Sequence, residues 1–357
     1  MFKIPFGLKI FRVISFFYNY KQTAIYRKVY IKNQAYKILN KLNQTKKKNI
    51  LLVFDCKISP GTIGDFIRFT MIGRFFLSMN FNVTMVIIIG EYRESWNRHD
   101  GKRGINKHLN VIKQIAKQLL TKKTKVEMMN FLKFEKSKYF NNKNYFILFP
   151  ERVKHRIQIY RESFNLLNYF VYFSNKKKID NILLNKKILS KNFNCKKLPK
   201  KYVTLHCRRE RKKKYYDRNL KRHEFERVIK LIKNNFIGFK IIIISDKYGC
   251  KFFKKISKKN KYDCLFSKDF SNKVLGDGYI ILNSSFHFQL FGGGMDAFPL
   301  YSKIPCLVNQ KRKNNEIYLS NIKASFWQTK NQTIMVDESS KRFFKKLEKI
   351  NLDYLNV

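Results

Sequence analysis

Two short segments combine groups that could carry out chemistry, and each follows an apolar run. The first is residues 59–65 (SPGTIGD), after the run 51–54, and it ends in Asp65. The second is residues 206–209 (HCRR), at the end of the run 202–205. Both lie where a predicted strand gives way to a helix, and ligands bind at such points in open α/β sheets. A carboxylate in one half and two guanidinium groups in the other suit the transfer of a group from a phosphate-bearing donor.

The first segment offers close backbone approach and one acid. Gly61 and Gly64 allow a tight turn and bring the backbone near a ligand. The helix that follows would present its N-terminal amides to that ligand. Asp65 is interpreted either as a general base for an acceptor hydroxyl or as an acid that favours the helix N-terminus.

The second segment offers groups suited to a diphosphate. Arg208 and Arg209 have planar, paired donors that match phosphate oxygens. An arginine pair alone is a weak signal in so basic a chain, and its position after a strand is what favours a site. His206 precedes the pair, and Asp246 follows the next predicted strand, so both are candidate donor-site residues.

A third segment, residues 283–296, is rich in hydroxyls, amides and glycines. These groups suit a phosphate or ribose cradle, although the pattern is neither G-x-G-x-x-G nor a Walker loop. The chain has 14 glycines, so a run of three favours function over a bare turn. His287 could equally be a core histidine with satisfied hydrogen bonds. The candidate donor-binding residues here are Ser284, Ser285, His287, Gln289, Gly292, Gly293, Gly294 and Asp296.

Other kinds of site are disfavoured by what the sequence lacks. It has no Asp-x-Asp pair to hold a metal beside a diphosphate, no zinc-type His/Cys spacing and no G-x-S-x-G elbow. No metal or cofactor is therefore predicted. The six cysteines are scattered without a C-x-x-C pair, which is typical of a reducing compartment.

The elements that must position these segments form two α/β halves. The pattern predicts a basic helical extension over 1–48, one domain over 49–175 and another over 176–357, within a chain of 357 residues. Alternating strands and helices in each half imply parallel sheets covered by helices, that is, two Rossmann-like domains facing a cleft. Predicted strands are 49–54, 83–89, 126–131, 145–149, 201–205, 239–244, 279–282 and 306–308, and predicted helices are 63–71, 105–120, 225–236 and 341–350.

The charge balance is strongly basic, with Lys+Arg 76 against Asp+Glu 24 and a formal net charge of +52. Such an excess attracts nucleic acid, anionic lipid or a polyanionic substrate. The basic residues are spread along the chain, and Lys, Asn, Ile, Phe and Tyr are abundant together, as an A/T-rich genome would encode. Mutational bias with a solvated surface is thus favoured over a selected anion-binding face, and no specific nucleic-acid partner is expected.

The first 20 residues place three basic side chains among apolar ones. This segment is interpreted either as an amphipathic helix on an anionic membrane surface or as a helix packed on the protein body. No apolar run approaches the ~20 residues of a membrane span. The expected location is the cytoplasm, with a peripheral place on the inner face of the membrane as the alternative.

These segments resemble GT-B glycosyltransferases, which use nucleotide-sugar donors without an essential metal. Gly64-Asp65 resembles the N-terminal Gly-Asp turn of bacterial heptosyltransferases, where the aspartate is the proposed base. The His206-x-Arg208-Arg209 pattern resembles the signature of α-1,6-fucosyltransferases, where the arginines bind the donor diphosphate. Ser284-Ser285 resembles their later serine pair, and the glycine run is similar to that of bacterial surface-polysaccharide enzymes. Arg211 replaces an acid usual in the fucosyltransferase pattern.

The resemblance implies a function for each half. Residues 49–175 would bind the acceptor, a cell-surface glycan or lipid-linked glycan, and residues 176–357 would bind the nucleotide-sugar. Asp65, Arg208 and Arg209 would be catalytic, while the donor stays open among hexosyl, fucosyl and heptosyl groups. The alternatives are a basic nucleic-acid-binding protein and a membrane-surface scaffold, both without catalysis.

Overall fold

The computed structural model describes most of the chain, with gaps. The described residues are 20–45, 48–59, 61–92, 96, 101–120, 124–140, 142–148, 163–174, 179–190, 198–209, 219–291, 293–310, 329–336 and 338–350. The segment 1–19, proposed to contact membrane, lies outside them, as does the predicted boundary between residues 175 and 176. The domain limits therefore stay predictions.

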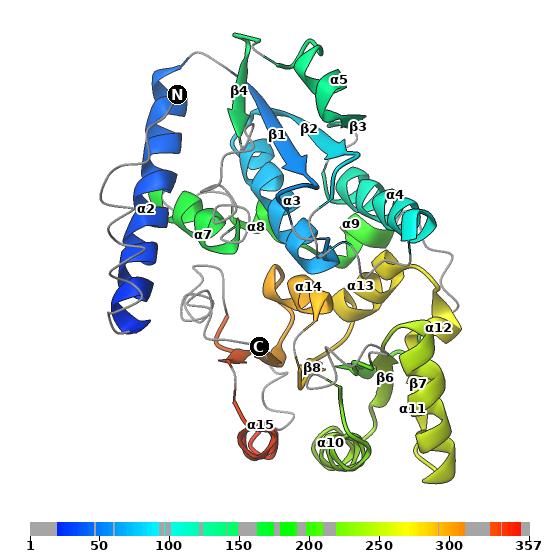
Figure 1. The fold of residues 1–357 in the computed structure, drawn as a ribbon. Coiled ribbons are helices and arrows are strands. Elements are labelled where there is room, and N and C mark those ends of the chain that lie inside the picture. The colour runs from blue at the N-terminus through cyan, green and yellow to red at the C-terminus, as the bar shows by residue number, and fades with distance from the viewer. Residues whose placement is uncertain are drawn as a thin grey trace.

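The first half of the chain forms a four-stranded parallel sheet in the order β3-β2-β1-β4 (Figure 1). Its strands are β1 (Asn49–Asp55), β2 (Asn82–Ile89), β3 (Lys125–Asn130) and β4 (Tyr145–Leu148). Residues 50–54 of β1 are a continuous apolar run, which is typical of a parallel strand covered on both faces. Alternate residues of β1 enter two different apolar clusters, Leu52 on one face and Leu51 on the other.

Helices cover both faces of this sheet. One face carries α3 (Ile63–Ser78) and α4 (Gly101–Leu119), and α5 (Phe131–Glu135) belongs to the other. Helix α2 (Tyr20–Gln44) packs on α7 (Ser163–Phe173), which in turn packs on α3 (Figure 1). Helix α2 confirms the predicted helix over the described part of the N-terminal extension. Within the described ranges, no helix is long and apolar enough to cross a membrane.

The second half forms a separate six-stranded parallel sheet in the order β10-β9-β8-β5-β6-β7. Its strands are β5 (Tyr202–His206), β6 (Lys240–Ile244), β7 (Cys264–Phe266), β8 (His287–Gln289), β9 (Cys306–Gln310) and β10 (Gln332–Val336). Numbered from the start of each half, the strand orders are 3-2-1-4 and 3-2-1-4-5-6, and the latter is the Rossmann order. The fold is thus two Rossmann-like units, as predicted.

Two groups of helices enclose the second sheet. The outer face carries α10 (Arg222–Asn235), α11 (Lys247–Lys259) and α15 (Ser340–Leu347). Between the two sheets lie α13 (Val274–Leu282) and α14 (Ala297–Leu300) (Figure 1). The 3-10 turn η4 (Gly294–Asp296) directly precedes α14 and contacts α3. The short helices α8 (Ile179–Ile182), α9 (Lys186–Ser190) and α12 (Ser267–Phe270) complete the described helices.

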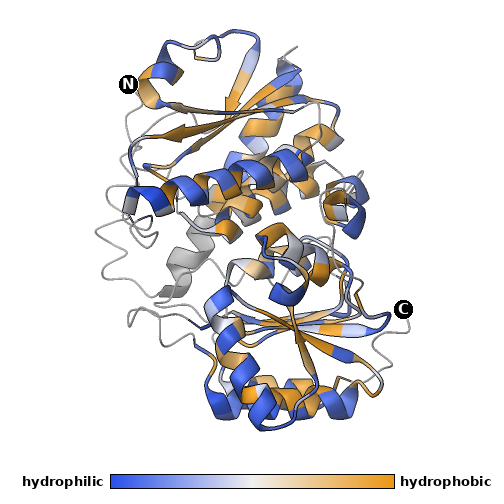
Figure 2. Ribbon diagram, turned by 90° about the vertical axis from the view of Figure 1, so that its right-hand side faces the viewer, coloured by the Kyte–Doolittle hydropathy of each residue, from blue (hydrophilic) through white to orange (hydrophobic). Residues whose placement is uncertain are grey.

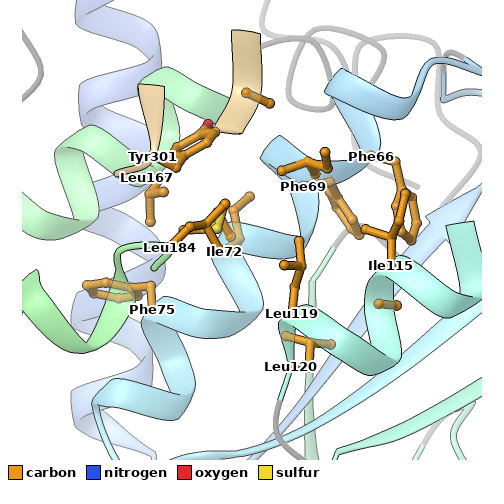
Figure 3. Packing of buried hydrophobic residues seen from close by; sticks show 14 of the residues in the cluster. Phe66, Phe69, Ile72, Phe75, Ile115, Leu119, Leu120, Leu167, Leu184 and Tyr301 are labelled. Atoms are coloured by element: carbon orange, nitrogen blue, oxygen red, sulfur yellow. The ribbon is translucent and has the colours of Figure 1, made fainter. Parts of the chain in front are cut away.

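One apolar cluster continues from the first unit into the second. Ile72 of α3 lies near Leu184 and Tyr301, which come from the connection between the units and from the second unit (Figure 3). In Figure 2 the apolar colour follows the strands and the inward sides of the helices of both units. Burial of apolar surface across the junction therefore holds the two units together.

The prediction of a strand over residues 279–282 is wrong. These residues are the second half of α13, and the short strand β8 follows at 287–289, where no strand was predicted. A run of four apolar residues fits a strand or a buried helix equally well by periodicity. Tertiary packing favours the helix. Gly278 lets α13 approach α14 closely, since a Cβ at this position would lie 2.4 Å from Cε1 of Phe298.

Candidate functional site

The carboxyl ends of strands from the two units meet at one junction. Residues 62–65 follow β1, and residues 293–296 follow β8, so each segment lies beside the place where its sheet reverses strand order. A Cβ on Gly64 would lie 2.7 Å from the Cα of Gly294, so the two backbones touch. Only glycine allows so close an approach. The structure therefore brings together the first and third predicted segments.

Asp65 is held in place at the start of α3. Thr62 caps the helix, and its Oγ1 accepts a hydrogen bond from the Asp65 amide at 3.0 Å and donates to Asp65 Oδ2. Arg68 Nη1 donates to Asp65 Oδ1 at 3.1 Å. The Asp65 side chain keeps 24% of its surface exposed. A carboxylate with fixed orientation and solvent access can take a proton, which is what a base requires.

Arg68 links this acid to the second unit. Its Nη2 donates to Asp296 Oδ1 at 2.8 Å, and both side chains are buried. Asp296 was predicted to bind the donor, and the structure places it against this guanidinium. Sequence reasoning missed Arg68. The available signal was a basic residue three positions after Asp65 with apolar residues on both sides of it in a mostly apolar helix, because a charge in such a setting needs a buried partner.

His206 ends β5 and lies beside the glycine run. A Cβ on Gly293 would lie 2.7 Å from Cε1 of His206. Its Nδ1 lies 3.0 Å from Gln289 Oε1, and an amide oxygen can only accept, so Nδ1 carries the proton. Burial first, and then Arg208, lowers the pKa of His206 to about 4. A neutral His206 thus leaves Nε2 as a hydrogen-bond acceptor.

The segment before and within β8 contributes three further candidates, Ser284, Ser285 and His287. The His287 Nδ1 lies 2.9 Å from Thr204 Oγ1, and burial lowers the pKa of His287 to about 3, with a smaller effect of His206. Ser284 Oγ donates to the Ile281 carbonyl at 2.7 Å. Ser284 and His287 are buried, while Ser285 is partly buried. Their predicted donor-binding roles stay predictions.

The arginine pair follows β5 directly. Arg208 and Arg209 are both partly buried, and the Arg209 guanidinium lies 4.2 Å from the centre of the Phe252 ring on α11. Such stacking holds the planar group in one orientation. Asp246, after β6, is exposed and caps α11 by accepting from the Gly249 amide at 2.6 Å. The candidate residue Gly292 lies outside the described residues, and so does Arg211, which replaces the acid of the fucosyltransferase pattern.

Gly61 has a packing partner that the sequence did not reveal. A Cβ on Gly61 would lie 2.7 Å from Cδ2 of Trp96, and the Trp96 indole nitrogen donates to the Ser59 carbonyl at 3.0 Å. Trp96 is fully buried. Trp96 therefore packs against the loop between β1 and α3 and stabilises its conformation.

The junction has no group of metal ligands in the part of the chain that is described. No three His, Cys, Asp or Glu residues there could hold a metal ion together. Metal independence was expected from the sequence and stays a prediction.

Comparisons with known proteins gave structural likenesses only. No protein family matches the sequence, and no curated protein matches it either. E. coli heptosyltransferase WaaC with ADP-2-deoxy-2-fluoro heptose is 11% identical, covers 86% of this chain and 98% of its own, and has a TM-score of 0.41. E. coli ADP-heptose lps heptosyltransferase II is 9% identical, covers 86% and 98%, and has a TM-score of 0.44.

A glycosyl transferase of family 9 from Veillonella parvula is also similar. It is 10% identical, covers 85% of this chain and 89% of its own, and has a TM-score of 0.40. The function proposed below therefore rests on the site geometry of this chain.

Proposed function

We propose that the protein is a glycosyltransferase that moves a sugar from a nucleotide-sugar to an acceptor hydroxyl. The observation that carries the proposal is the junction itself. A held but accessible carboxylate, Asp65, lies next to Gly64, whose backbone meets that of Gly294 in the segment after β8 of the second unit. A neutral histidine, His206, ends β5, the neighbour of β8, and the arginine pair follows that strand. These are the positions where open α/β sheets bind ligands.

The proposed reaction is a single displacement at the anomeric carbon. The acceptor hydroxyl gives its proton to the Asp65 carboxylate, and its oxygen forms a bond to the anomeric carbon. The bond from that carbon to the diphosphate oxygen breaks, and its electron pair leaves with the nucleoside diphosphate. Arg208 and Arg209 stabilise the negative charge that develops on the leaving group.

The finer assignments belong to the same proposal. The acceptor is a cell-surface glycan or lipid-linked glycan, and the transfer needs no metal. The protein acts in the cytoplasm, and attachment of the N-terminal segment to the inner face of the membrane stays open as the alternative to its packing on the protein body. The donor sugar stays open among hexosyl, fucosyl and heptosyl groups.

Ligand binding tests the donor assignment. A bound nucleotide raises the midpoint of thermal unfolding, so we expect one of ADP, GDP, UDP and CMP to stabilise the parent. Arg208→Ala and Arg209→Ala should weaken that binding while leaving the fold intact. Arg222→Ala is the matched control, because Arg222 is an exposed arginine on α10 that pairs with Glu226.

Two results would contradict this function. One is unchanged nucleotide affinity in both arginine variants, which would remove the pair from the donor site. The other is binding to nucleic acid that falls steeply with salt, without any effect of nucleotides. That result would favour the basic nucleic-acid-binding alternative.

A further inference from the structure

The junction contains a buried guanidinium that needs a functional explanation. Arg68 lies one turn after Asp65 on α3, and only 5% of its side-chain surface is exposed. Burial of a charge is costly unless partners and hydrogen bonds compensate for it. Arg68 meets Asp65 on its own unit at 3.1 Å and Asp296 on the second unit at 2.8 Å. Asp65 lies three residues before Arg68 in the sequence, whereas Asp296 lies 228 residues after it.

The two carboxylates differ in access. The Asp296 side chain is 3% exposed, whereas the Asp65 side chain is 24% exposed. A substrate hydroxyl can approach Asp65 but has little room to reach Asp296. The geometry suits Asp296 to holding Arg68, which differs from the donor-binding role expected from the sequence.

We propose that Arg68 and Asp296 are positioning residues for Asp65, so that the base is completed by both units. The inference rests on the proposed function. Asp296 fixes the guanidinium, and the guanidinium fixes Oδ1 of Asp65. Thr62 fixes Oδ2 from the other side. Each oxygen of a carboxylate has more than one acceptor site, so Asp65 can still receive a proton.

The type of residue fits this role. The planar fork of arginine directs Nη1 and Nη2 in different directions, and here each nitrogen meets a different carboxylate. The ammonium of lysine is a single compact charge without this fork. The contact of Gly64 with Gly294 fixes the start of α3 on the second unit, which keeps the three charged groups in register.

The test separates positioning from stability and from donor binding. The parent, Asp65→Asn, Arg68→Gln, Arg68→Lys and Asp296→Asn are compared for release of nucleoside diphosphate from ADP-, GDP- and UDP-sugars, with water as acceptor. Affinity for the free nucleoside diphosphate is measured by calorimetry, and folding by thermal unfolding. The matched control is Asp277→Asn, which removes a buried carboxylate paired with Lys268 elsewhere in the second unit.

We expect Arg68→Gln and Asp296→Asn to lower kcat about 10- to 100-fold, the loss typical of a misplaced reacting group. Nucleotide affinity should stay within about twofold, and Arg68→Lys should recover part of the loss, as fits a positioning charge. Asp277→Asn can lower the unfolding midpoint but should leave kcat of the folded protein unchanged.

The remaining outcomes separate the two proposals. Loss of turnover in Asp65→Asn but not in Arg68→Gln would overturn only the positioning role. Weaker nucleotide binding in Asp296→Asn would return Asp296 to the donor site and also overturn it. If the parent releases no nucleoside diphosphate from any donor, the proposed function and this inference fail together.

Discussion

Replacement of Arg74 by methionine should destabilise the protein, because this side chain joins three segments. Arg74 lies in α3 and donates to the carbonyl of Leu119, at the end of α4, at 2.6 Å. It also donates to the carbonyls of Ile182 at 2.7 Å, Asn181 at 2.9 Å and Leu183 at 3.3 Å. The last three residues belong to the connection between the units.

The magnitude follows from the two shortest bonds. Both are partly buried, and a hydrogen bond from a charged donor contributes about 1.5–3 kcal/mol. Together they give about 3–6 kcal/mol, and water can replace the partners of the more exposed bond to Asn181. Burial lowers the pKa of Arg74 to about 10, so removal of the charge offsets part of the loss. We expect Arg74→Met to lower the free energy of unfolding by about 2–4 kcal/mol.

Urea unfolding followed by circular dichroism measures this change through the midpoint and slope. The control is Arg342→Met, since Arg342 is exposed on α15 and pairs with Glu338 at the surface. Such pairs contribute about 0–1 kcal/mol. A loss in Arg74→Met no larger than that in Arg342→Met would refute the reasoning, because it would mean that the four carbonyls are equally well satisfied by water.

Three further predictions follow from the junction and from the buried histidines. The pKa values of His206 and His287, about 4 and about 3, lie below the ordinary 6.5. Their contribution to stability is therefore complete above pH 6.5 and decreases as the pH falls toward 4. Between pH 6.5 and 5 we expect urea unfolding to show a loss of about 2–4 kcal/mol. Gly64→Ala should cost about 1–3 kcal/mol in the same assay and lower turnover, because its Cβ would meet the Gly294 backbone. EDTA should leave donor turnover unchanged, since the proposed leaving-group charges are neutralised by arginine.

The glycine prediction and the histidine prediction each have a control variant. Gly73→Ala, also in α3, places its Cβ near a flexible Leu120 methyl and should cost less than Gly64→Ala. Asp277 has the opposite effect on the pH dependence of stability. Burial raises the pKa of Asp277 to about 6, so its contribution to the free energy of unfolding is present below pH 3.8 and is lost as the pH rises through 6. A stability that is flat between pH 6.5 and 5 in Asp277→Asn would contradict the histidine prediction. Loss of turnover in EDTA with recovery in Mg²⁺ or Mn²⁺ would contradict the metal prediction.

The sequence was sufficient to predict the elements that carry the site. The run 49–54 and the glycine turn before Asp65 predicted β1 and the start of α3, and the structure has both. The run 201–205 and the helix 225–236 that ends before Gly238 predicted β5 and α10. These segments are strongly patterned and bounded by glycine or charge, so the local pattern was enough to predict them. Their order also implied two parallel sheets.

The tertiary structure alone decided which of these groups meet. Gly64 and Gly294 are in contact although they lie 230 residues apart in the sequence numbering. Arg68 pairs with Asp296, which lies 228 residues away in the sequence. Nothing in a local pattern encodes such a pairing, because it depends on how the two units pack. The same reason explains the error at residues 279–282, where burial against α14 favoured a helix over a strand. A chain's periodicity fixes which face of an element is buried, whereas the partner that buries it is set by the packing of the whole molecule.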